Sequence, residues 1–224
     1  MKIFDHYYKS RKSEPVFKKK EERVDLQLNI VAGINLATVK FKSTYHESIV
    51  NTKFDLGTSF AFGVAADFVL PRNNRKWSFD NELLYVHYKL NGTYEKYIND
   101  NNYTIASSTL AYSYIKLNNM FRYKIYSGNF NLFVNAGISN GIAFNEINEN
   151  TTFVNLYSVE TTSKGKFLND TRRYEQGYLL GFGGIYKIFS FEFRYEHGSG
   201  MSDVFTINSQ TKRYYFLFGF RLIK

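Results

Sequence analysis

Histidine, serine and carboxylate side chains are the groups in this 224-residue chain that could perform nucleophilic catalysis. Three of the four histidines fall in or near polar segments that also carry hydroxyl and carboxylate groups. The histidines are His46, His87 and His197, and the neighbouring groups are Glu47, Ser48, Ser199 and Asp203. A hydrolase or acyltransferase needs its nucleophile, base and orienting carboxylate within hydrogen-bond reach. The spacing of these residues does not enforce that contact, so we assign no catalytic residue. A rim-located membrane hydrolase or acyltransferase is the third of our hypotheses.

The sequence also lacks the common patterns for metals, nucleotides and redox cofactors. It has no cysteine, which excludes thiolate zinc sites and cysteine nucleophiles, and it has no HxH or HExxH spacing. The segment GFGGIY, residues 181–186, departs from the GxGxxG pattern of dinucleotide-binding folds. No phosphate-binding loop of the form GxxxxGKS or GxxxxGKT occurs. We therefore predict no metal and no cofactor.

Acidic and basic side chains form the best-defined constellation in the sequence. They recur on the polar face of segments whose other face is apolar, and neighbouring segments carry opposite signs at comparable depths. The set comprises Asp67, Asp80, Glu82, Lys116, Arg122, Lys124, Glu192, Arg194, Glu196, Arg213 and Arg221. A buried ion is costly unless it is paired, so we predict that these side chains form an ion-pair network with a structural role. A proton or ion relay along the same side chains is the alternative.

The segments that carry these charges alternate apolar and polar residues with a period of two, as β-strands do. In DLQLNIVAGINLAT, residues 25–38, leucine, isoleucine and alanine occupy one face, and mainly glutamine, asparagine and glycine occupy the other. We predict a strand for each segment of this kind: residues 25–38, 57–70, 77–88, 110–125, 130–141, 177–187, 190–197 and 213–223. Most of these segments are long enough to supply the roughly 9–11 residues with which a tilted strand crosses hydrocarbon.

The connections between the predicted strands alternate in length. Those after the second, fourth and sixth strands are tight turns, such as PRNNRK at residues 71–76, and the others are long and polar. The longest, near residues 143–176, is rich in Asn, Thr, Glu and Lys. Short turns at one end and long loops at the other are typical of an outer-membrane barrel. We therefore predict an all-β fold, an eight-stranded antiparallel up-and-down transmembrane β-barrel with four long extracellular loops and short periplasmic turns.

The composition of the two strand faces favours a membrane barrel over a soluble one. The polar face is rich in Gly, Ala, Ser and Asn, which suit the narrow interior of an eight-stranded barrel and leave no open diffusion pore. The apolar face, predicted to contact outer-membrane lipid, carries aromatic residues towards the strand ends, where interface girdles lie. We assign to this interface Trp77, Phe79, Tyr123, Tyr186 and Tyr214. A soluble lipocalin-like ligand-binding barrel, with the two faces exchanged, is the alternative.

Charge and hydropathy restrict the remaining classes. No apolar run approaches the roughly 18–20 residues that a membrane-spanning helix needs. The net charge is +9, but no basic stripe carries stacking aromatics on one face, so we predict no nucleic-acid partner. Residues 1–24 include the basic run KSRKSEPVFKKKEER and contain no apolar secretory signal. We predict a basic periplasmic lead-in or linker at residues 1–24 and the barrel domain at residues 25–224.

The ordered series of strands resembles the PorT-like outer-membrane β-barrel family over about residues 25–224. The similarity rests on LNIVAGINLATVKF, FGVAADFVLPRNNRKWSFDNELLYVHYK, YIKLNNMFRYKI, FEFRYEHGSG and YYFLFGFRLIK. It implies the barrel end of a longer chain with a signal peptide and a periplasmic domain. Some relatives are described as tRNA-modification GTPases, which this chain cannot match without a phosphate-binding loop. Such barrels usually finish on an aromatic residue, whereas this chain ends Arg221-Leu222-Ile223-Lys224.

These observations together predict a non-enzymatic outer-membrane barrel with a filled, charged lumen. The resemblance implies an envelope or secretion-associated structural role. The barrel would serve as an anchor or interaction protein, through its loops or its periplasmic N-terminus. Besides lipid, we expect a periplasmic or surface protein as partner. The sequence leaves the identity of that partner and the oligomeric state open.

Overall fold

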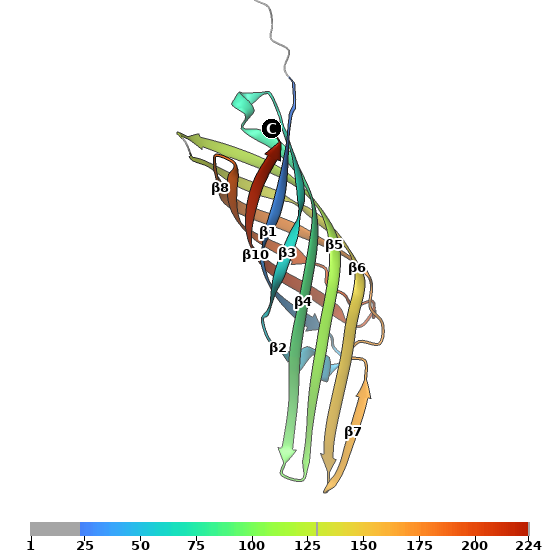
Figure 1. Ribbon diagram of the computed structural model, residues 1–224. Coiled ribbons are helices and arrows are strands. Elements are labelled where there is room, and N and C mark those ends of the chain that lie inside the picture. The colour runs from blue at the N-terminus through green and yellow to red at the C-terminus, as the bar shows by residue number, and fades with distance from the viewer. Residues whose placement is uncertain (1–22, 129, 224) are drawn as a thin grey trace, which may run out of the picture.

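The computed structural model describes residues 23–128 and 130–223, and most of these residues lie in β-strands (Figure 1). The strands are β1 (Asp25–Lys42), β2 (Lys53–Phe54), β3 (Gly57–Val69), β4 (Trp77–Asn99), β5 (Asn102–Ser127), β6 (Phe130–Leu156), β7 (Val159–Gly165), β8 (Tyr174–Tyr186), β9 (Phe189–Gly198) and β10 (Asn208–Ile223). Two short helical elements, α2 (Glu47–Asn51) and η1 (Asn73–Arg75), lie between strands. None of the described helices has the length and apolar character that crossing a membrane requires. Residues 1–22 of the predicted lead-in lie outside the described residues.

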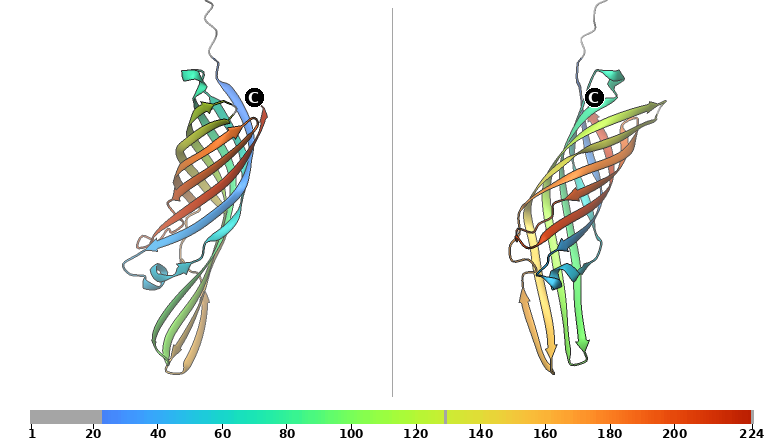
Figure 2. Two further views of the ribbon diagram at one scale, coloured as in Figure 1. Left: turned by 90° about the vertical axis from the view of Figure 1, so that its left-hand side faces the viewer. Right: turned by 180° about the vertical axis from the view of Figure 1, so that it is seen from behind.

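Eight of the strands close into a ring, which Figure 2 shows from two further sides. In the order β1, β3, β4, β5, β6, β8, β9 and β10, each strand pairs antiparallel with the next. The pairing of β1 with β10 closes the ring and places Ile34 opposite Phe216. The prediction of an eight-stranded antiparallel up-and-down barrel is therefore confirmed.

Alternation along each strand sends large apolar side chains outward and small or polar ones inward. In β3, Phe60, Phe62 and Val64 are exposed, whereas Ala61 and Ala65 are buried. Gly33 on β1 shows how little room the interior offers, because a Cβ at this position would overlap the backbone carbonyl of Phe216 on β10. The small residues of the inward face are thus a packing requirement of a narrow barrel.

Three tight turns close the periplasmic end of the barrel, at the top of Figure 1. In the turn between β3 and β4, Asn73 and Asn74 have φ angles of 54° and 55°. Asparagine tolerates this left-handed region better than most residues, so the PRNNRK segment suits the turn. Gly128, between β5 and β6, has a φ of 60°, which glycine adopts without strain.

The four long connections lie at the opposite, extracellular end, but two of them consist largely of strand. The sequence pattern ended the third strand at residue 88 and began the fourth at residue 110, whereas β4 continues to Asn99 and β5 begins at Asn102. Similarly, β6 continues past residue 141 to Leu156. These extensions are rich in Thr, Tyr and Ile, which favour strands. Outside the membrane they need no apolar outer face, so the alternation that marks the membrane strands does not continue into them in the same phase.

The extended strands form one sheet that reaches beyond the rest of the molecule (Figures 1 and 2). We call this sheet the projection and define it as residues 94–106 of the β4–β5 hairpin and residues 150–165 of the β6–β7 hairpin. Its strand order is β4, β5, β6 and β7, with every neighbouring pair antiparallel. The tips are tight turns at residues 100–101 and 157–158. The barrel strands therefore continue as a sheet, without a flexible linker.

Candidate functional site

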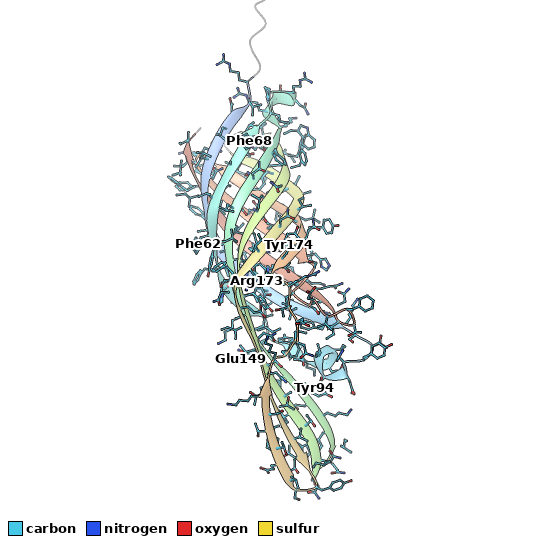
Figure 3. The ribbon with its side chains drawn as sticks, turned by 90° about the vertical axis from the view of Figure 1, so that its right-hand side faces the viewer. Phe62, Phe68, Tyr94, Glu149, Arg173 and Tyr174 are labelled. Carbon is cyan, nitrogen blue, oxygen red and sulfur yellow. The ribbon has the colours of Figure 1, made fainter. Side chains whose placement is uncertain are left out.

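The orientation of the strand faces decides between a membrane barrel and a soluble ligand-binding barrel. Phe216 and Phe218 on β10 are 52% and 39% exposed, whereas Arg194 and Glu196 on β9 are 1% and 0% exposed. Phe62 likewise lies on the outside of the ribbon in Figure 3. A lipocalin-like barrel would place the aromatic side chains inside and the charges in water. The soluble alternative is therefore wrong.

The predicted interface aromatics lie on this outer face. Trp77 and Tyr123 stand opposite each other on β4 and β5 with their rings 4.8 Å apart, and Phe79 is two residues further along β4. Tyr186 ends β8 at the same periplasmic end of the barrel. Tyr214 lies nearer the extracellular start of β10, so it belongs to the other half of the wall. The assignment of these residues to a lipid interface remains a prediction.

The inward face carries three groups of buried charges, stacked along the barrel. The first lies nearest the periplasmic end and consists of Asp67, Asp80, Arg122 and Lys124. We call it the lower cluster, counting from the periplasmic to the extracellular end. Arg122 Nη2 lies 2.8 Å from Asp80 Oδ2, and Lys124 Nζ lies 2.6 Å from Asp67 Oδ2. Arg122 Nη1 also approaches Asp67 Oδ2 at 3.5 Å. Each cation in this cluster thus has a carboxylate partner from β3 or β4.

The middle cluster consists of Glu82, Glu192 and Arg194. Arg194 binds Glu82 with two parallel contacts, Nη1 to Oε1 at 2.6 Å and Nη2 to Oε2 at 3.1 Å. Its Nε donates to Glu192 Oε1 at 2.6 Å, and Asn118 donates to Glu82 at 2.7 Å. Because β4 and β9 are not neighbours in the ring, the contact between Arg194 and Glu82 crosses the lumen. The guanidinium of Arg194 therefore fills the barrel at this level.

The upper cluster consists of Lys116, Glu175, Glu196 and Arg213. Arg213 lies 2.6 Å from Glu175 and 2.7 Å from Glu196, and Lys116 pairs with both carboxylates, at 3.3 Å in the case of Glu175. Tyr215 donates its hydroxyl proton to the other oxygen of Glu196 at 2.7 Å. Two carboxylates and two cations thus neutralise each other in a space from which solvent is excluded.

The three clusters bring together ten of the predicted luminal charges and differ from the prediction in two positions. Arg221 lies at the periplasmic mouth, where the described residues offer it no ion pair, and it lines a cavity of about 30 Å³ with Asp67 and Asp80. Glu175 was missed because residues 143–176 were assigned to a loop. Its position two residues before Gly177 continues the inward face of β8, and that spacing was the available signal.

Above the charges, the interior becomes apolar. The tyrosine tier, Tyr88, Tyr112 and Tyr114, is buried with ring centroids 5.7 to 6.2 Å apart. The guanidinium of Arg213 lies 5.2 Å from the ring centre of Tyr88 and 5.4 Å from that of Tyr114. Cations attract the faces of aromatic rings, so the tier both covers the upper cluster and adds to its stabilisation.

The extracellular end of this interior is closed by a segment that the sequence pattern assigned to a polar loop. Phe167 and Leu168, which we call the cap, are buried against the tyrosine tier and its apolar neighbours. Phe167 packs between Phe41 and Phe54, with ring centroids 5.4 Å from each. The only sequence signal was the apolar pair itself within the polar stretch KGKFLND.

Asn148 on β6 holds the cap in place. Its Oδ1 accepts hydrogen bonds from the backbone N–H groups of Phe167 and Leu168, each at 3.0 Å. Its Nδ2 donates to the carbonyl oxygen of Leu168 at 2.8 Å. One side chain thereby satisfies three backbone groups in a segment that belongs to no strand. Sequence reasoning did not single out Asn148, because asparagine is common throughout this connection.

The three rim histidines make separate contacts. His46 Nε2 lies 3.3 Å from the hydroxyl of Thr206, and His87 Nδ1 lies 3.0 Å from that of Ser113. His197 lines a rim cavity of about 560 Å³ together with Arg172. Within residues 23–128 and 130–223, no group of three or more His, Cys, Asp or Glu side chains could hold a metal ion. The structure thus shows no carboxylate bonded to His46 or His87 in the described chain, and it brings no two of these histidines together.

The two edges of the projection differ in their contacts. On the β4 edge, Lys96 Nζ lies 3.0 Å from Glu47 of α2, and β2 pairs with Gly92 and Thr93 just outside the projection. This hydrogen bond to Glu47 raises the pKa of Lys96 above its ordinary value. On the other edge, β7 pairs with β6 alone among the described strands, and all seven of its residues are exposed. Figure 3 shows Glu149 and Tyr94 near the base of the projection, on the extracellular side of the barrel.

Comparison with known proteins places this barrel in a family. Residues 17–206 match the family described as outer membrane protein beta-barrel domain. No curated protein matches the chain. Ail of Yersinia pestis is 11% identical, with 88% of this chain and 99% of Ail covered and a TM-score of 0.40. The Neisserial surface protein A, NspA, is 12% identical, with 88% and 99% covered and a TM-score of 0.39. OprG of Pseudomonas aeruginosa is 9% identical, with 91% and 99% covered and a TM-score of 0.42.

The family match covers most of the chain and agrees with the closed ring of antiparallel strands and its apolar outer face. The chain belongs to the outer membrane protein beta-barrel domain family, and it is an eight-stranded barrel of the bacterial outer membrane.

Proposed function

We propose that this protein is a non-enzymatic outer-membrane anchor, closed to solutes, that presents its projection to a partner outside the cell. The observation that carries the proposal is the four-stranded projection itself, which continues directly from the barrel wall. A rigid sheet held away from the membrane is a suitable surface for contact with another molecule. The barrel below it fixes the position and orientation of that surface.

The interior supports the closed state. The middle cluster spans the lumen at the level of Arg194, the tyrosine tier covers the upper cluster, and the cap covers the tier. A solute would have to break buried ion pairs and displace apolar side chains at separate levels. An eight-stranded barrel has an interior only wide enough for side chains, so these obstacles cannot move aside easily. Passage of a proton along the charged clusters is the alternative that the test below also examines.

A catalytic role has little support. A rim enzyme would need a nucleophile, a base and an orienting group in mutual contact. His87 contacts Ser113, but no carboxylate is bonded to the other ring nitrogen among the described residues. His46 contacts a threonine and His197 lines the rim cavity, and no hydrogen bond joins either to a carboxylate in the described chain.

The periplasmic end offers a second route to a partner. The predicted lead-in of residues 1–24 would join the barrel of residues 25–224 at this end, where Arg72, Arg75 and Lys187 lie in the turns. A secretion-associated role, as the PorT-like resemblance implies, would act from this side of the membrane. We rank it second because the projection is the larger described structure outside the barrel.

The proposal is tested with a trimmed chain that keeps the barrel and the cap. Tyr94 stands opposite Ala106, and Asn150 stands opposite Gly165, so each pair can be joined by a two-residue Asn-Gly turn. Cells that display the full chain should bind surfaces coated with envelope or extracellular-matrix proteins, and cells with the trimmed chain should bind at the background level. Equal binding by the two chains would contradict the proposal.

The closed state is tested separately in planar bilayers and in vesicles loaded with a pH-sensitive dye. Both chains should give no steady current and no faster proton leak than empty bilayers. A steady current through the full chain would contradict a closed lumen, and a proton leak alone would favour the relay. Altered mobility of unboiled against boiled sample shows in each case that the barrel is folded.

A further inference from the structure

The open edge of the projection, strand β7, has the properties of a pairing site. Its seven residues, VETTSKG, are bonded to β6 on one side, from Leu156 opposite Val159 to Asn150 opposite Gly165. Among the described residues no strand pairs with the other side. An edge of this kind presents a row of free N–H and C=O groups to which another strand can add. The β4 edge of the projection differs in that Lys96 is bound by Glu47 of α2, and β2 pairs with Gly92 and Thr93 just outside the projection.

The charges of β7 are arranged symmetrically about its central residue, Thr162. Glu160 lies two residues before Thr162, and Lys164 lies two residues after it. In an antiparallel pair of two β7 strands centred on Thr162, Glu160 of each copy stands opposite Lys164 of the other. Opposite charges in facing positions stabilise strand pairs, and like charges destabilise them. A parallel in-register pair would instead place Glu160 beside Glu160 and Lys164 beside Lys164.

The direction of β7 determines where a second copy must lie. β7 runs along the length of the projection, between its tip and the barrel (Figures 1 and 2). An antiparallel pair is related by a two-fold axis perpendicular to the strands, so the two barrels point in opposite directions. Both copies cannot then lie in one membrane. We propose that β7 pairs antiparallel with β7 of a second copy in a facing membrane, in the register centred on Thr162. This inference rests on the proposed function and names the partner of the projection.

The geometry leaves room for this overlap. Seven residues of strand span roughly 23 Å, so the two β6–β7 hairpins overlap along the full length of β7, with the tip of each copy beside Gly165 of the other. Val159, next to the tip, stands opposite Gly165 of the second copy. No atom lies within 4 Å of a Cβ built on Gly165, so this end of the strand is open to a neighbour.

One such pair is weak, and the inference depends on many acting together. A contact between two short strands buries less than the roughly 1,000 Å² expected of a stable complex. Two membranes that each carry many copies form many contacts at once, which increases the overall affinity without new interactions. The protein should therefore remain monomeric in detergent and join vesicles only at high surface density.

Charge reversal tests the register. Vesicles that carry the wild-type chain should cluster, as measured by light scattering, and vesicles with Glu160→Lys or with Lys164→Glu should not cluster with themselves. A mixture of the two variant populations restores both opposite-charge pairs and should cluster as the wild type does. Glu95→Lys and Lys53→Glu, at exposed positions away from β7, make the same charge changes and should leave clustering intact. Wild-type vesicles that stay dispersed at every density, or a mixture that stays dispersed while the wild type clusters, would overturn the inference.

Cross-linking tests the direction of the strands, because the chain has no natural cysteine. Vesicles with Glu160→Cys should form disulfides with vesicles that carry Lys164→Cys, since facing residues lie at a separation that a disulfide can bridge. Glu160→Cys should not cross-link with itself. Self-cross-linking of Glu160→Cys within one vesicle population would show parallel pairing in one membrane and contradict the inference. Mobility changes on boiling verify that every variant is folded.

The two proposals can fail independently. If the trimmed chain loses binding to a coated surface but the charge variants cluster like the wild type, the projection has another partner and only the pairing of β7 is wrong. If charge reversal abolishes clustering while trimmed and full chains bind the coated surfaces equally, contact between copies is the role of the projection. In that case the proposed binding of the projection to another molecule is contradicted, and the pairing of β7 stands.

Discussion

The barrel interior has two regions with opposite chemistry. At the level of the membrane, buried Arg, Lys, Asp and Glu side chains form paired clusters beside a small apolar group that includes Val31, Leu84 and Leu217. Above that level, the tyrosine tier and the cap fill the interior with aromatic and aliphatic groups. Both regions exclude solvent and are surrounded by the same ring of strands. The difference therefore cannot come from the fold and must come from what lies outside the strands.

Strand β4 shows how the surroundings determine the interior. Near its start, Leu83 faces outward and Glu82 faces inward, whereas further along Lys89 faces outward and Leu90 faces inward. The alternation of apolar and polar residues reverses its phase within one continuous strand. In lipid the outer face must be apolar, which leaves the polar residues inside. In water the outer face can be polar, so the interior can form an ordinary hydrophobic core. The reversal marks the height at which the strand leaves the membrane.

The largest effect should come from breaking the middle cluster. Arg194→Leu leaves Glu82 and Glu192 without their main partner, and removing one member of a buried pair typically costs about 3–5 kcal/mol. We expect the free energy of unfolding, measured by urea titration in detergent micelles, to fall by that amount. Arg221→Leu is the matched control, because no ion pair to Arg221 exists in the described residues. Equal losses in the two variants would mean that pairing does not stabilise the charged region.

Truncation in the cap should have a smaller effect. Leu168→Ala removes buried methyl groups from the apolar region, for which about 2–4 kcal/mol is expected and less where the site can collapse. The loss should appear in the same unfolding titration, and Leu156→Ala, at an exposed position near the tip, should cause almost none. If Leu168→Ala behaves like Leu156→Ala, the cap is not a folded part of the core.

Removal of the polar contacts of the cap should have a smaller and more local effect. Asn148→Ala leaves two N–H groups and one carbonyl without their partner, which corresponds to about 1–3 kcal/mol for groups that stay buried. We expect faster hydrogen exchange at the amides of Phe167 and Leu168 and unchanged exchange in the lower barrel. Asn51→Ala on the exposed helix α2 serves as control. Acceleration throughout the barrel would show that the two regions unfold as one unit.

The smallest effect concerns pH at the base of the projection. The pKa of Lys96 is raised by its contact with Glu47, so that contact is complete below the ordinary lysine pKa and is lost as the pH rises through the raised value. Both side chains are exposed, so we expect no measurable change in barrel unfolding over this range. A nuclear magnetic resonance titration of Lys96 should show a lower pKa in Glu47→Gln. An unchanged pKa would mean that the two groups do not interact in solution.

The same contrast explains how much could be predicted from the sequence. The membrane strands were recognisable because lipid demands an apolar outer face, so residues such as Phe60 and Phe62 recur at every second position. Arg194 and Glu82 could be assigned to the interior for the same reason. That these two side chains pair with each other across the lumen could not be predicted, because β4 and β9 are far apart in both sequence and ring order.

The extracellular region was harder to predict because a strand in water does not need an apolar outer face. The extensions of β4, β5 and β6 have mixed faces, and their tight turns at residues 100–101 and 157–158 lie within long polar stretches. The cap depends on contacts between Phe167 and residues of β1 and β2, which no local pattern encodes. Glu175 was not predicted for a simpler reason. β8 begins at Tyr174, a few residues before the position at which the sequence pattern began this strand.

The turn between Asp100 and Asn101 has a practical consequence. It joins two long strands that pair into the barrel wall with one irregularity, between Tyr97 and Asn99, and Asn99 lies eleven positions beyond Tyr88 on β4. That length of strand corresponds to roughly 36 Å. Exposed loop tips accept inserted segments more readily than any other position. A peptide inserted at this turn would be carried on a stiff arm, clear of the lipid headgroups, which makes the protein a natural scaffold for displaying epitopes on living bacteria.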